Sequence, residues 1–487
     1  MTTSDVLLQL SATKLAALVR TREARSIEIV DAHIDRIQRV NGALNAVVCD
    51  RFDEARREAR AADARTGKGE LPPFHGVPCT IKECFALEGM PQTSGLVARR
   101  GFRPQEDATA VRRLREAGAI PLGVTNVSEL CMWMEASNAV YGRTNNPYDA
   151  RRTCGGSSGG EGAIVGAGGS PFGLGSDIGG SVRMPAFFCG VFGHKPTGGL
   201  VPGTGQYPIA SGAALRYLAT GPLARRAEDL WPLLQLLAGP DGKDAGTRAF
   251  ELGDPRAVDL KDVRLISVDD NGALHVSHEL RVAQARASTA LQERGAKLVP
   301  WKSDALRHSV QIWSALMTAA GGPTFASLLG DGSEVRQLRE LGLWMRGRSD
   351  HTLPAIGLAI LESLTKLVPA AQQVRFEELA RALADEMRQV LGPNGILLYP
   401  SYTRTAPRHH TALLPPIQWM YTAIFNALEM PATQVPLGLD PRGLPLGVQV
   451  AALPGNDHLT IAAALALEED FGGWVLPPLL AAADGGR

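Results

Sequence analysis

The sequence "GGSSGGEGAIVGAGGSPFGLGSDIGGSVR" occupies residues 155–183 and has an unusual composition. Twelve of the 26 residues from 155 to 180 are glycine, yet isoleucine, valine, phenylalanine, leucine and proline are interspersed among them. A flexible linker has no need of these apolar side chains. Glycine is tolerated at this density where the backbone takes positive φ or approaches another group closely. The stretch therefore predicts an ordered segment whose backbone comes very close to another group.

Phosphate and metal binding are the first alternatives for this segment. Glycine-rich loops that open helices bind phosphate, but neither G-x-x-x-x-G-K-[ST] nor G-x-G-x-x-G occurs in the chain. The zinc motif H-E-x-x-H is also missing. His275 and His278 lie three residues apart and His409 and His410 are adjacent, and such a pair alone is a weak indication of a metal site. We expect neither a metal nor a nucleotide cofactor.

Two serines in the segment are candidates for nucleophilic chemistry. Residues 155–159 satisfy G-x-S-x-G, the nucleophile elbow, with Ser157 at its centre. That motif requires a buried strand just before the serine, whereas the polar sequence YDARRTC precedes this one. Ser181 follows S-D-I-G-G, where unhindered backbone N–H groups can converge on one oxygen, as an oxyanion hole requires. Ser181 is therefore the better candidate.

A serine hydroxyl hardly ionises near neutral pH, so Ser181 needs a base. Lys82 lies in "GVPCTIKECF", a mostly apolar, strand-like run in which an ammonium group is costly to bury. In one interpretation the stem of Lys82 lies along the sheet and its ammonium group reaches water. In the other, burial favours the neutral amine, which can then accept the serine proton. Spacing alone does not decide between them.

The overall composition is that of an ordinary globular protein, since 45% of the 487 residues are hydrophobic and 21% are charged. Fifty basic residues balance fifty acidic ones, so no net field attracts nucleic acid or an anionic membrane surface. Arg112, Arg113 and Arg115 are expected to lie on a solvated helix face. This charge balance argues against nucleic acid as a partner.

The cysteines and the amino terminus bear on location. The six cysteines form neither a C-x-x-C pair nor a dense disulfide pattern, which favours reduced thiols. The start of the chain, "MTTSDVLLQLSATKLAALVR", has no basic leader and no cleavage site. No segment approaches the roughly 20 apolar residues that cross a bilayer. We therefore expect a soluble, cytoplasmic protein without a membrane span.

Strand-like and helical segments alternate along the chain, which predicts an α/β sheet. Residues 1–70 are expected to be helical, with His33 on the polar side of a helix. Strand-like runs lie at 76–81, 119–126, 263–268, 296–301, 396–402 and 446–453, and a helix is expected over about 278–292. Residues 303–395 are helical and locally apolar, and they form either plain core or the wall of a substrate channel. The apolar side chains in question are Trp313, Met317, Leu341, Trp344 and Met345.

Taken together, several motifs resemble the amidase signature family. They are "IKE" from 81, "GGSSGG" from 155 and "GSDIGGSVRMPAFFCGVFGHKPT" from 175, with Ser181 standing 24 positions after Ser157. The sequences "TNVSELCMWMEASNAVYGRTNNPYD" from 125, "APRHH" from 406 and "GLPLGVQV" from 443 resemble most closely the fatty-acid amide hydrolase 2 branch. The resemblance implies one domain over 1–487, with a large, mixed, twisted sheet covered by helices on both faces. Its parts would be a helical 1–70, a catalytic core 71–260, a variable segment 303–395 and a part 396–487 that completes the sheet.

The resemblance also implies a catalytic triad. Ser181 would be the nucleophile, Ser157 would follow a cis Gly156–Ser157 peptide and relay the proton, and Lys82 would be the base. The backbone N–H groups of the oxyanion hole would be those of Ile178, Gly179, Gly180 and Ser181.

The roles of neighbouring residues have alternatives. Asp177 and Arg183 would tie the nucleophile loop in place, or form an ordinary exposed ion pair. Ser158 would support the relay or a local turn. Side chains that would line the acyl pocket, or else pack in the core, are Cys131, Met132, Trp133, Met134 and Trp419.

The activity implied is cofactor-free hydrolysis of small-molecule carboxylic amides with an apolar acyl or aryl part, extending to esters, anilides or carbamates. "IKE" stands where "VKD" is commoner, and the membrane-spanning amino terminus of the fatty-acid amide hydrolase branch is missing, so lipid amides are not assured as substrates. The alternatives are a glutamine amidase that supplies ammonia to a transamidation complex, a scaffold that has lost catalysis, and a classical hydrolase with Ser157 as nucleophile and a histidine base. The sequence leaves the oligomeric state open, a homodimer included.

Overall fold

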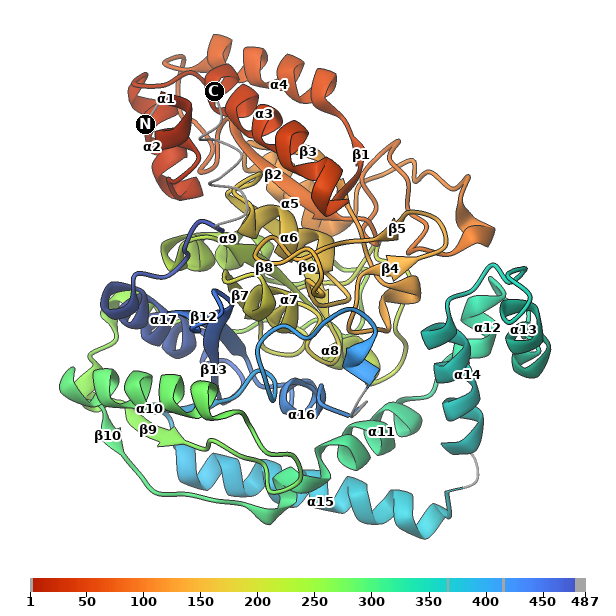
Figure 1. The fold of residues 1–487 in the computed structure, drawn as a ribbon. Coiled ribbons are helices and arrows are strands. Elements are labelled where there is room, and N and C mark those ends of the chain that lie inside the picture. The colour runs from red at the N-terminus through yellow and green to blue at the C-terminus, as the bar shows by residue number, and fades with distance from the viewer. Residues whose placement is uncertain (1–2, 366–367, 414–416, 478–487) are drawn as a thin grey trace.

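The computed structural model describes residues 3–365, 368–413 and 417–477, and within them an eleven-stranded sheet runs through the molecule (Figure 1). This confirms the expected mixed α/β fold. In sheet order the strands are β1 (Val47–Asp50), β3 (Ala119–Thr125), β2 (Val77–Lys82), β6 (Phe172–Asp177), β8 (Ala219–Ala224), β7 (Phe192–Lys195), β12 (Ala432–Leu439), β13 (Pro445–Ala452), β11 (Gly395–Tyr399), β9 (Arg264–Ser267) and β10 (Lys297–Leu298). A two-stranded ribbon, β4 (Ser137–Asn138) and β5 (Gly142–Arg143), lies outside it.

The direction of the strands brings two chain segments of the site together. β2 pairs in parallel with β3 and with β6, in the register Ile81 to Leu174. β9 pairs in parallel with β10 and β11, and the other neighbours are antiparallel. Parallel neighbours end at the same edge of a sheet. Lys82 at the end of β2 therefore lies beside the end of β6, which leads to Ser181.

Helices cover both faces of the sheet, as expected. Successive residues of a strand point to opposite faces. On one face, a Cβ on Gly193 would come within 2.6 Å of Ala186 in α7 (Arg183–Phe188). On the other, the ring of His194 bonds to Thr433, which bonds to Thr460 in α17 (Asp457–Phe471). α6 (Gly159–Gly166) packs beside α7, and α10 (His278–Glu293) beside α17.

The remaining helices of the core form the amino-terminal layer or lie in the segments that connect the strands (Figure 1). They are α1 (Thr3–Leu7), α2 (Ala12–Thr21), α3 (Ser26–Leu44), α4 (Phe52–Arg65), α5 (Thr109–Glu116), α8 (Ala214–Tyr217), α9 (Leu230–Leu237) and α16 (Met420–Ala427). The part expected to be helical, 1–70, also contains the edge strand β1. The last ten residues of the part 396–487 lie outside the described residues.

Two expectations about polar side chains were wrong. His33 is buried inside α3, where its Nδ1 lies 2.8 Å from the Ile29 carbonyl oxygen and burial lowers its pKa to about 3. Arg113 is not simply solvated, because its guanidinium donates to the carbonyls of Leu237 and Gly239 at the end of α9. Both side chains bond to backbone carbonyl oxygens. Hydrophobic periodicity in the sequence does not reveal such bonds.

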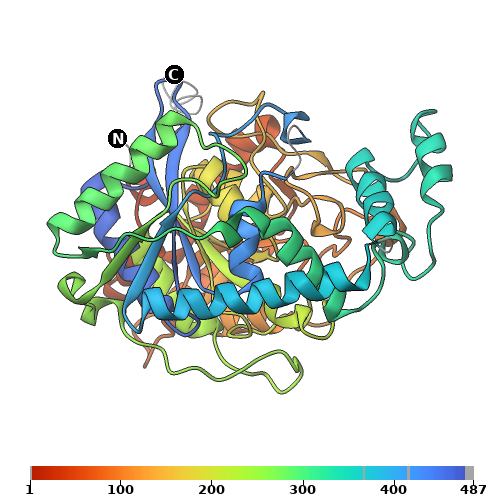
Figure 2. The ribbon, with the colours of Figure 1, turned by 90° about the horizontal axis from the view of Figure 1, so that it is seen from below.

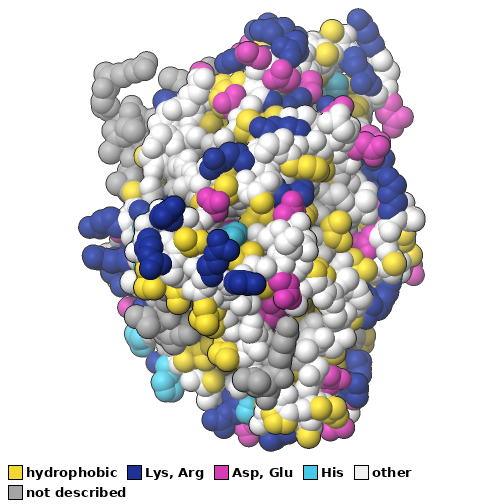
Figure 3. All heavy atoms as spheres, turned by 90° about the vertical axis from the view of Figure 1, so that its right-hand side faces the viewer, with side chains coloured by type: hydrophobic (Ala, Val, Ile, Leu, Met, Phe, Trp, Pro, Cys, Tyr) yellow, Lys and Arg dark blue, Asp and Glu magenta, His cyan; other side chains and the backbone are white. Residues whose placement is uncertain are grey.

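The variable segment consists of α11 (Ser309–Ala320), α12 (Phe325–Leu329), α13 (Gln337–Trp344), α14 (Leu353–Thr365) and α15 (Ala370–Leu391). α15 runs along the sheet, whereas α12–α14 project from the molecule (Figure 2). On the side of the molecule that carries α12–α14, apolar side chains lie among lysines and arginines (Figure 3). Trp344 is 40% and Met345 70% exposed. These two side chains therefore lie neither in the core nor in the wall of an enclosed channel.

Candidate active site

The Lys82 amine lies at the end of β2 with no exposed surface. Its Nζ is 2.7 Å from Ser157 Oγ and 2.9 Å from Ser176 Oγ. The interpretation in which this ammonium group reaches water was therefore wrong. A buried amine bonded to two hydroxyls can exchange a proton with either of them.

The loop that carries Ser157 is held by close backbone packing. The Gly156–Ser157 peptide is cis, as the resemblance implied. A Cβ on Gly156 would lie 2.3 Å from the Trp133 carbonyl oxygen, so only glycine fits there. Ser158 N–H donates to the carbonyl oxygen of Ser181 at 3.2 Å, and its hydroxyl to that of Ser176 at 3.3 Å. These bonds place the Ser157 loop directly against the Ser181 loop.

The Ser181 loop turns around the carboxylate of Asp177. Asp177 accepts hydrogen bonds from the Gly180 N–H at 2.7 Å and the Val182 N–H at 3.1 Å. The Gly180 N–H, one of four donors expected at the oxyanion hole, is therefore already bonded. Within the described residues the N–H groups of Ile178, Gly179 and Ser181 have no acceptor. Three donors thus remain available beside a Ser181 that is 8% exposed.

Asp177 and Arg183 form a fully buried ion pair with an N–O distance of 3.0 Å, so the alternative of an ordinary exposed pair was wrong. Burial disfavours the charged carboxyl, but the charge and hydrogen bonds of Arg183 hold the pKa of Asp177 well below its usual range. Arg183 also donates to Gln449 Oε1 at 2.8 Å and to Asn426 Oδ1 at 2.7 Å. The pair therefore connects the nucleophile loop to β13 and α16.

Glu161 is a buried residue of the site that the sequence did not single out. It accepts hydrogen bonds from Thr80 Oγ1 at 2.6 Å and Thr125 Oγ1 at 2.8 Å. Thr80 shares a face of β2 with Lys82, and Thr125 is the β3 partner of Lys82, so the carboxyl lies beside the lysine stem. Burial raises the pKa of Glu161 to about 8. Near neutral pH this carboxyl is mostly protonated.

This burial predicts a pH dependence of stability. Folded Glu161 keeps its proton up to about pH 8, whereas an ordinary carboxyl loses it near 4.5. Between about pH 4.5 and about pH 8 the folded chain therefore binds more protons than the unfolded chain. As a result, the free energy of unfolding of the wild type falls as pH rises through this range. In Glu161→Gln, which cannot ionise, the free energy of unfolding relative to wild type should rise between about pH 5 and about pH 8. Denaturant titrations at both values check this.

The control is Glu116→Gln, whose carboxyl pairs with Arg112 on the exposed side of α5. Its difference from wild type should stay constant over the same range. A constant difference for Glu161→Gln as well would contradict the burial argument.

The predicted acyl-pocket residues fall into two groups. Cys131 and Met134 are buried, whereas Met132 and Trp133 are half-buried. Leu130 and Cys131 take positive φ values of 53° and 59°, so this segment turns sharply. The backbone of Trp133 packs on Gly156, next to Ser157.

Two tryptophans lie at the other side of the Ser181 loop. Trp419, at the start of α16, has its ring 3.5 Å from the position of a Cβ on Gly179. Trp313 of α11 meets the Trp419 ring edge to face, with centroids 4.8 Å apart. Its indole N–H donates to the Ile178 carbonyl oxygen at 2.8 Å. Sequence reasoning noticed Trp313 only as an apolar residue of the variable segment.

The histidines do not form the alternative sites considered from the sequence. Over 3–365, 368–413 and 417–477, no three side chains among His, Cys, Asp and Glu come together as metal ligands. In the same ranges no histidine bonds to Ser157 or Ser181. His194 pairs with Asp457 at 3.1 Å, but its other ring nitrogen meets Thr433 in the core. This arrangement speaks against a histidine base.

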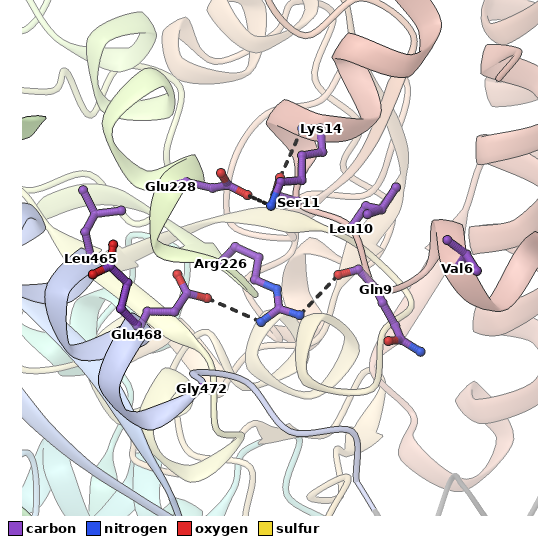
Figure 4. Close-up of a pocket in the computed structure, with 11 residues that line it drawn as sticks. Val6, Gln9, Leu10, Ser11, Lys14, Arg226, Glu228, Leu465, Glu468 and Gly472 are labelled. Atoms are coloured by element: carbon purple, nitrogen blue, oxygen red, sulfur yellow. Dashed lines mark hydrogen bonds and ion pairs between the residues drawn. The ribbon is translucent and has the colours of Figure 1, made fainter. Parts of the chain in front are cut away.

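A pocket of about 610 Å³ lies elsewhere, between the amino-terminal helices and α17 (Figure 4). Two ion pairs cross its wall, Lys14 to Glu228 at 3.0 Å and Arg226 to Glu468 at 3.5 Å. The remaining charged side chain of the lining, Glu469, pairs with Arg294 at 2.9 Å, and we assign this pocket no role in catalysis. In the part of the chain that the structure describes, no helix combines the length and apolar character that a bilayer span needs. The cytoplasmic location stays a prediction.

Comparisons with known proteins identify the family. Residues 28–461 match the family model Amidase. The chain is 45% identical to fatty-acid amide hydrolase 2 of Homo sapiens, over 97% of this chain and 91% of that protein. It is 31% identical to an acylamidase of Rhodococcus erythropolis, over 94% and 95%. The solved structure of a bacterial aryl acylamidase of the amidase signature family superposes with a TM-score of 0.81, at 25% identity and 98% and 99% coverage. The chain therefore belongs to the amidase signature family and is a hydrolase that acts on amide bonds.

Proposed function

We propose that the chain hydrolyses amides through an acyl-enzyme on Ser181, with Lys82 as base and Ser157 as proton relay. The observation that carries this proposal is the contact of 2.7 Å between a fully buried Lys82 amine and Ser157 Oγ. The Ser157 loop in turn bonds to the Ser181 backbone. Among the lysine and histidine side chains of the described ranges, only Lys82 bonds to Ser157, and the Cys131 thiol also bonds to this serine.

In the proposed mechanism the proton takes the same path in both directions. As Ser181 Oγ attacks the amide carbonyl carbon, its proton passes to Ser157 Oγ, and the Ser157 proton passes to neutral Lys82. When the C–N bond of the tetrahedral intermediate breaks, Lys82 returns a proton through Ser157 to the leaving amine. Water then attacks the carbonyl carbon of the acyl-enzyme, its proton is relayed through Ser157 to Lys82 in the same way, and the carboxylic acid is released.

The negative oxygen of the tetrahedral intermediate would be held by backbone donors. The N–H groups of Ile178, Gly179 and Ser181 lie in one loop and lack acceptors among the described residues. Removal of one essential donor of this kind typically costs about 3–4 kcal/mol of transition-state stabilisation. We therefore assign the oxyanion hole to these three groups rather than to the four expected.

The substrate class is inferred from the side chains around the loop. Trp313 and Trp419 at the Ser181 loop, and Trp133 beside Gly156, are half-buried and mostly apolar, which suits an apolar acyl or aryl group better than the polar side chain of glutamine. The identity of 45% to fatty-acid amide hydrolase 2 supports this choice, because a fatty acyl group is apolar. Esters, anilides and carbamates can acylate the same serine.

Labelling and a substrate panel test the proposal. A fluorophosphonate probe should phosphonylate wild type at Ser181, as located by mass spectrometry of the peptide, and should leave Ser181→Ala unlabelled. A medium-chain fatty amide and an acyl anilide should be hydrolysed with a kcat/KM at least about tenfold above that for glutamine. Preference for glutamine would favour the transamidation alternative. Absence of both labelling and hydrolysis would favour a catalytically silent scaffold.

A further inference from the structure

Each peptide unit that offers a free N–H to the oxyanion has its carbonyl oxygen hydrogen-bonded on the opposite side. The Asp177 oxygen, in the unit that carries the Ile178 N–H, accepts from Asn426 Nδ2 at 2.8 Å. The Gly180 oxygen, in the unit that carries the Ser181 N–H, accepts from the Met184 N–H at 2.7 Å. Because a peptide unit is planar, a bond that fixes its carbonyl also fixes the direction of its N–H.

The third unit, which carries the Gly179 N–H, is fixed from the variable segment. The Ile178 oxygen accepts from Trp313 Nε1 at 2.8 Å. Asn426 and Met184 belong to α16 and α7 of the core, whereas Trp313 belongs to α11, between 303 and 395. The indole is itself held by the edge-to-face contact with Trp419.

We propose that Trp313 is a positioning residue, whose indole N–H orients the Ile178–Gly179 peptide so that the Gly179 N–H points at the oxygen of the reacting carbonyl. This inference rests on the proposed function. The hydrogen bond to the carbonyl also polarises the peptide unit, which makes its N–H a better donor. The variable segment would thereby contribute to transition-state stabilisation as well as to the shape of the pocket.

The test removes the indole N–H and keeps an aromatic ring. Trp313→Phe should lower kcat for an acyl anilide about tenfold, the size expected when one hydrogen bond that acts in the transition state is lost, with a smaller change in KM. A trifluoromethyl ketone, which forms a tetrahedral adduct with serine, should bind about tenfold more weakly. The corresponding secondary alcohol, which cannot form the adduct, should bind as it does to wild type.

Trp301→Phe is the matched control. Trp301 Nε1 donates to Glu386 Oε1 at 2.9 Å, so the same substitution removes an indole hydrogen bond away from Ser181. Its kcat and its affinity for the ketone should equal those of wild type. If Trp313→Phe unfolds, β-(3-benzothienyl)alanine at position 313 keeps the two-ring shape without the N–H and serves for the same measurements.

The outcomes separate this inference from the proposed function. Equal loss of ketone and alcohol binding in Trp313→Phe would mean that the side chain only shapes the pocket. Unchanged kcat and ketone affinity would likewise overturn the positioning role. Wild type that fails to react with the fluorophosphonate at Ser181 would instead overturn the proposed function.

Discussion

Lys82→Ala is expected to lower kcat/KM for an acyl anilide by about 10⁴-fold. The buried amine bonds to Ser157 Oγ at 2.7 Å, and in the proposed mechanism it is the final acceptor of the Ser181 proton. An ester with a good leaving group should lose less activity, because its alkoxide leaves without protonation whereas an amine does not. Steady-state kinetics on a matched amide and ester measure both effects.

Lys195→Met is the control for the loss of a buried lysine. Lys195 is fully buried in β7, but its Nζ donates to the Pro196 carbonyl oxygen at 2.8 Å and to no serine. This variant should keep kcat/KM to within about tenfold even if its thermal midpoint falls. An equal loss of kcat/KM in both variants would show that removal of the Lys82 amine lowers activity by disturbing the fold. Full amidase activity in Lys82→Ala would remove the proposed base.

The local parts of the site could be predicted from the sequence. The apolar run that ends at Lys82 is β2. Of the two candidate serines, Ser157 lies in the loop before α6 and Ser181 in the loop after β6. Most expected strand-like runs are strands, although 296–301 contributes only the two residues of β10. β6, β7, β8 and β12 were not recognised, because short buried strands with glycine and polar residues lack an alternating pattern.

The glycine-rich segment approaches other groups closely, as expected, and most of these groups belong to the protein itself. Gly179 is an exception, because a Cβ there would meet nothing closer than 3.5 Å, and we attribute this glycine to the approach of the proposed substrate carbonyl. Gly160 instead packs on Asn126, with a Cβ position 2.3 Å from its backbone nitrogen. Gly180 has φ 123° and a Cβ position 2.1 Å from Thr422 Oγ1. Most of these glycines therefore allow backbone to pack on the rest of the protein.

The supporting residues could not be predicted, because their partners are distant in the sequence. Trp313 lies 135 residues from Ile178, and Asn426 lies 249 residues from Asp177. Each bond follows from how the variable segment and α16 pack on the sheet, and a single sequence gives no measure of that. The signal for Glu161 was present but unused, since a carboxyl in a glycine-rich, apolar helix needs donors nearby.

Asp177→Ala is expected to lower the apparent free energy of unfolding by about 3–5 kcal/mol, because it leaves the buried Arg183 guanidinium without its carboxylate. In the wild type the N–H groups of Gly180 and Val182 donate to that carboxylate, so the same substitution leaves both N–H groups without their acceptor. We expect the loop to lose its turn and amide hydrolysis to fall sharply even at temperatures where the protein stays folded. Denaturant titration and kinetics below the thermal midpoint measure the two effects.

Asp254→Ala is the matched control, because Asp254 forms an ion pair with Arg256 in which the side chains are 40% and 78% exposed. Water screens such a pair, so its loss should change the free energy of unfolding far less than the loss of Asp177 does, and should leave hydrolysis intact. The two aspartates differ in what surrounds the arginine that remains: protein in one case and solvent in the other. Equal destabilisation in both variants would mean that Arg183 finds other partners, among them Asn426 and Gln449, and that Asp177 is not what holds the nucleophile loop.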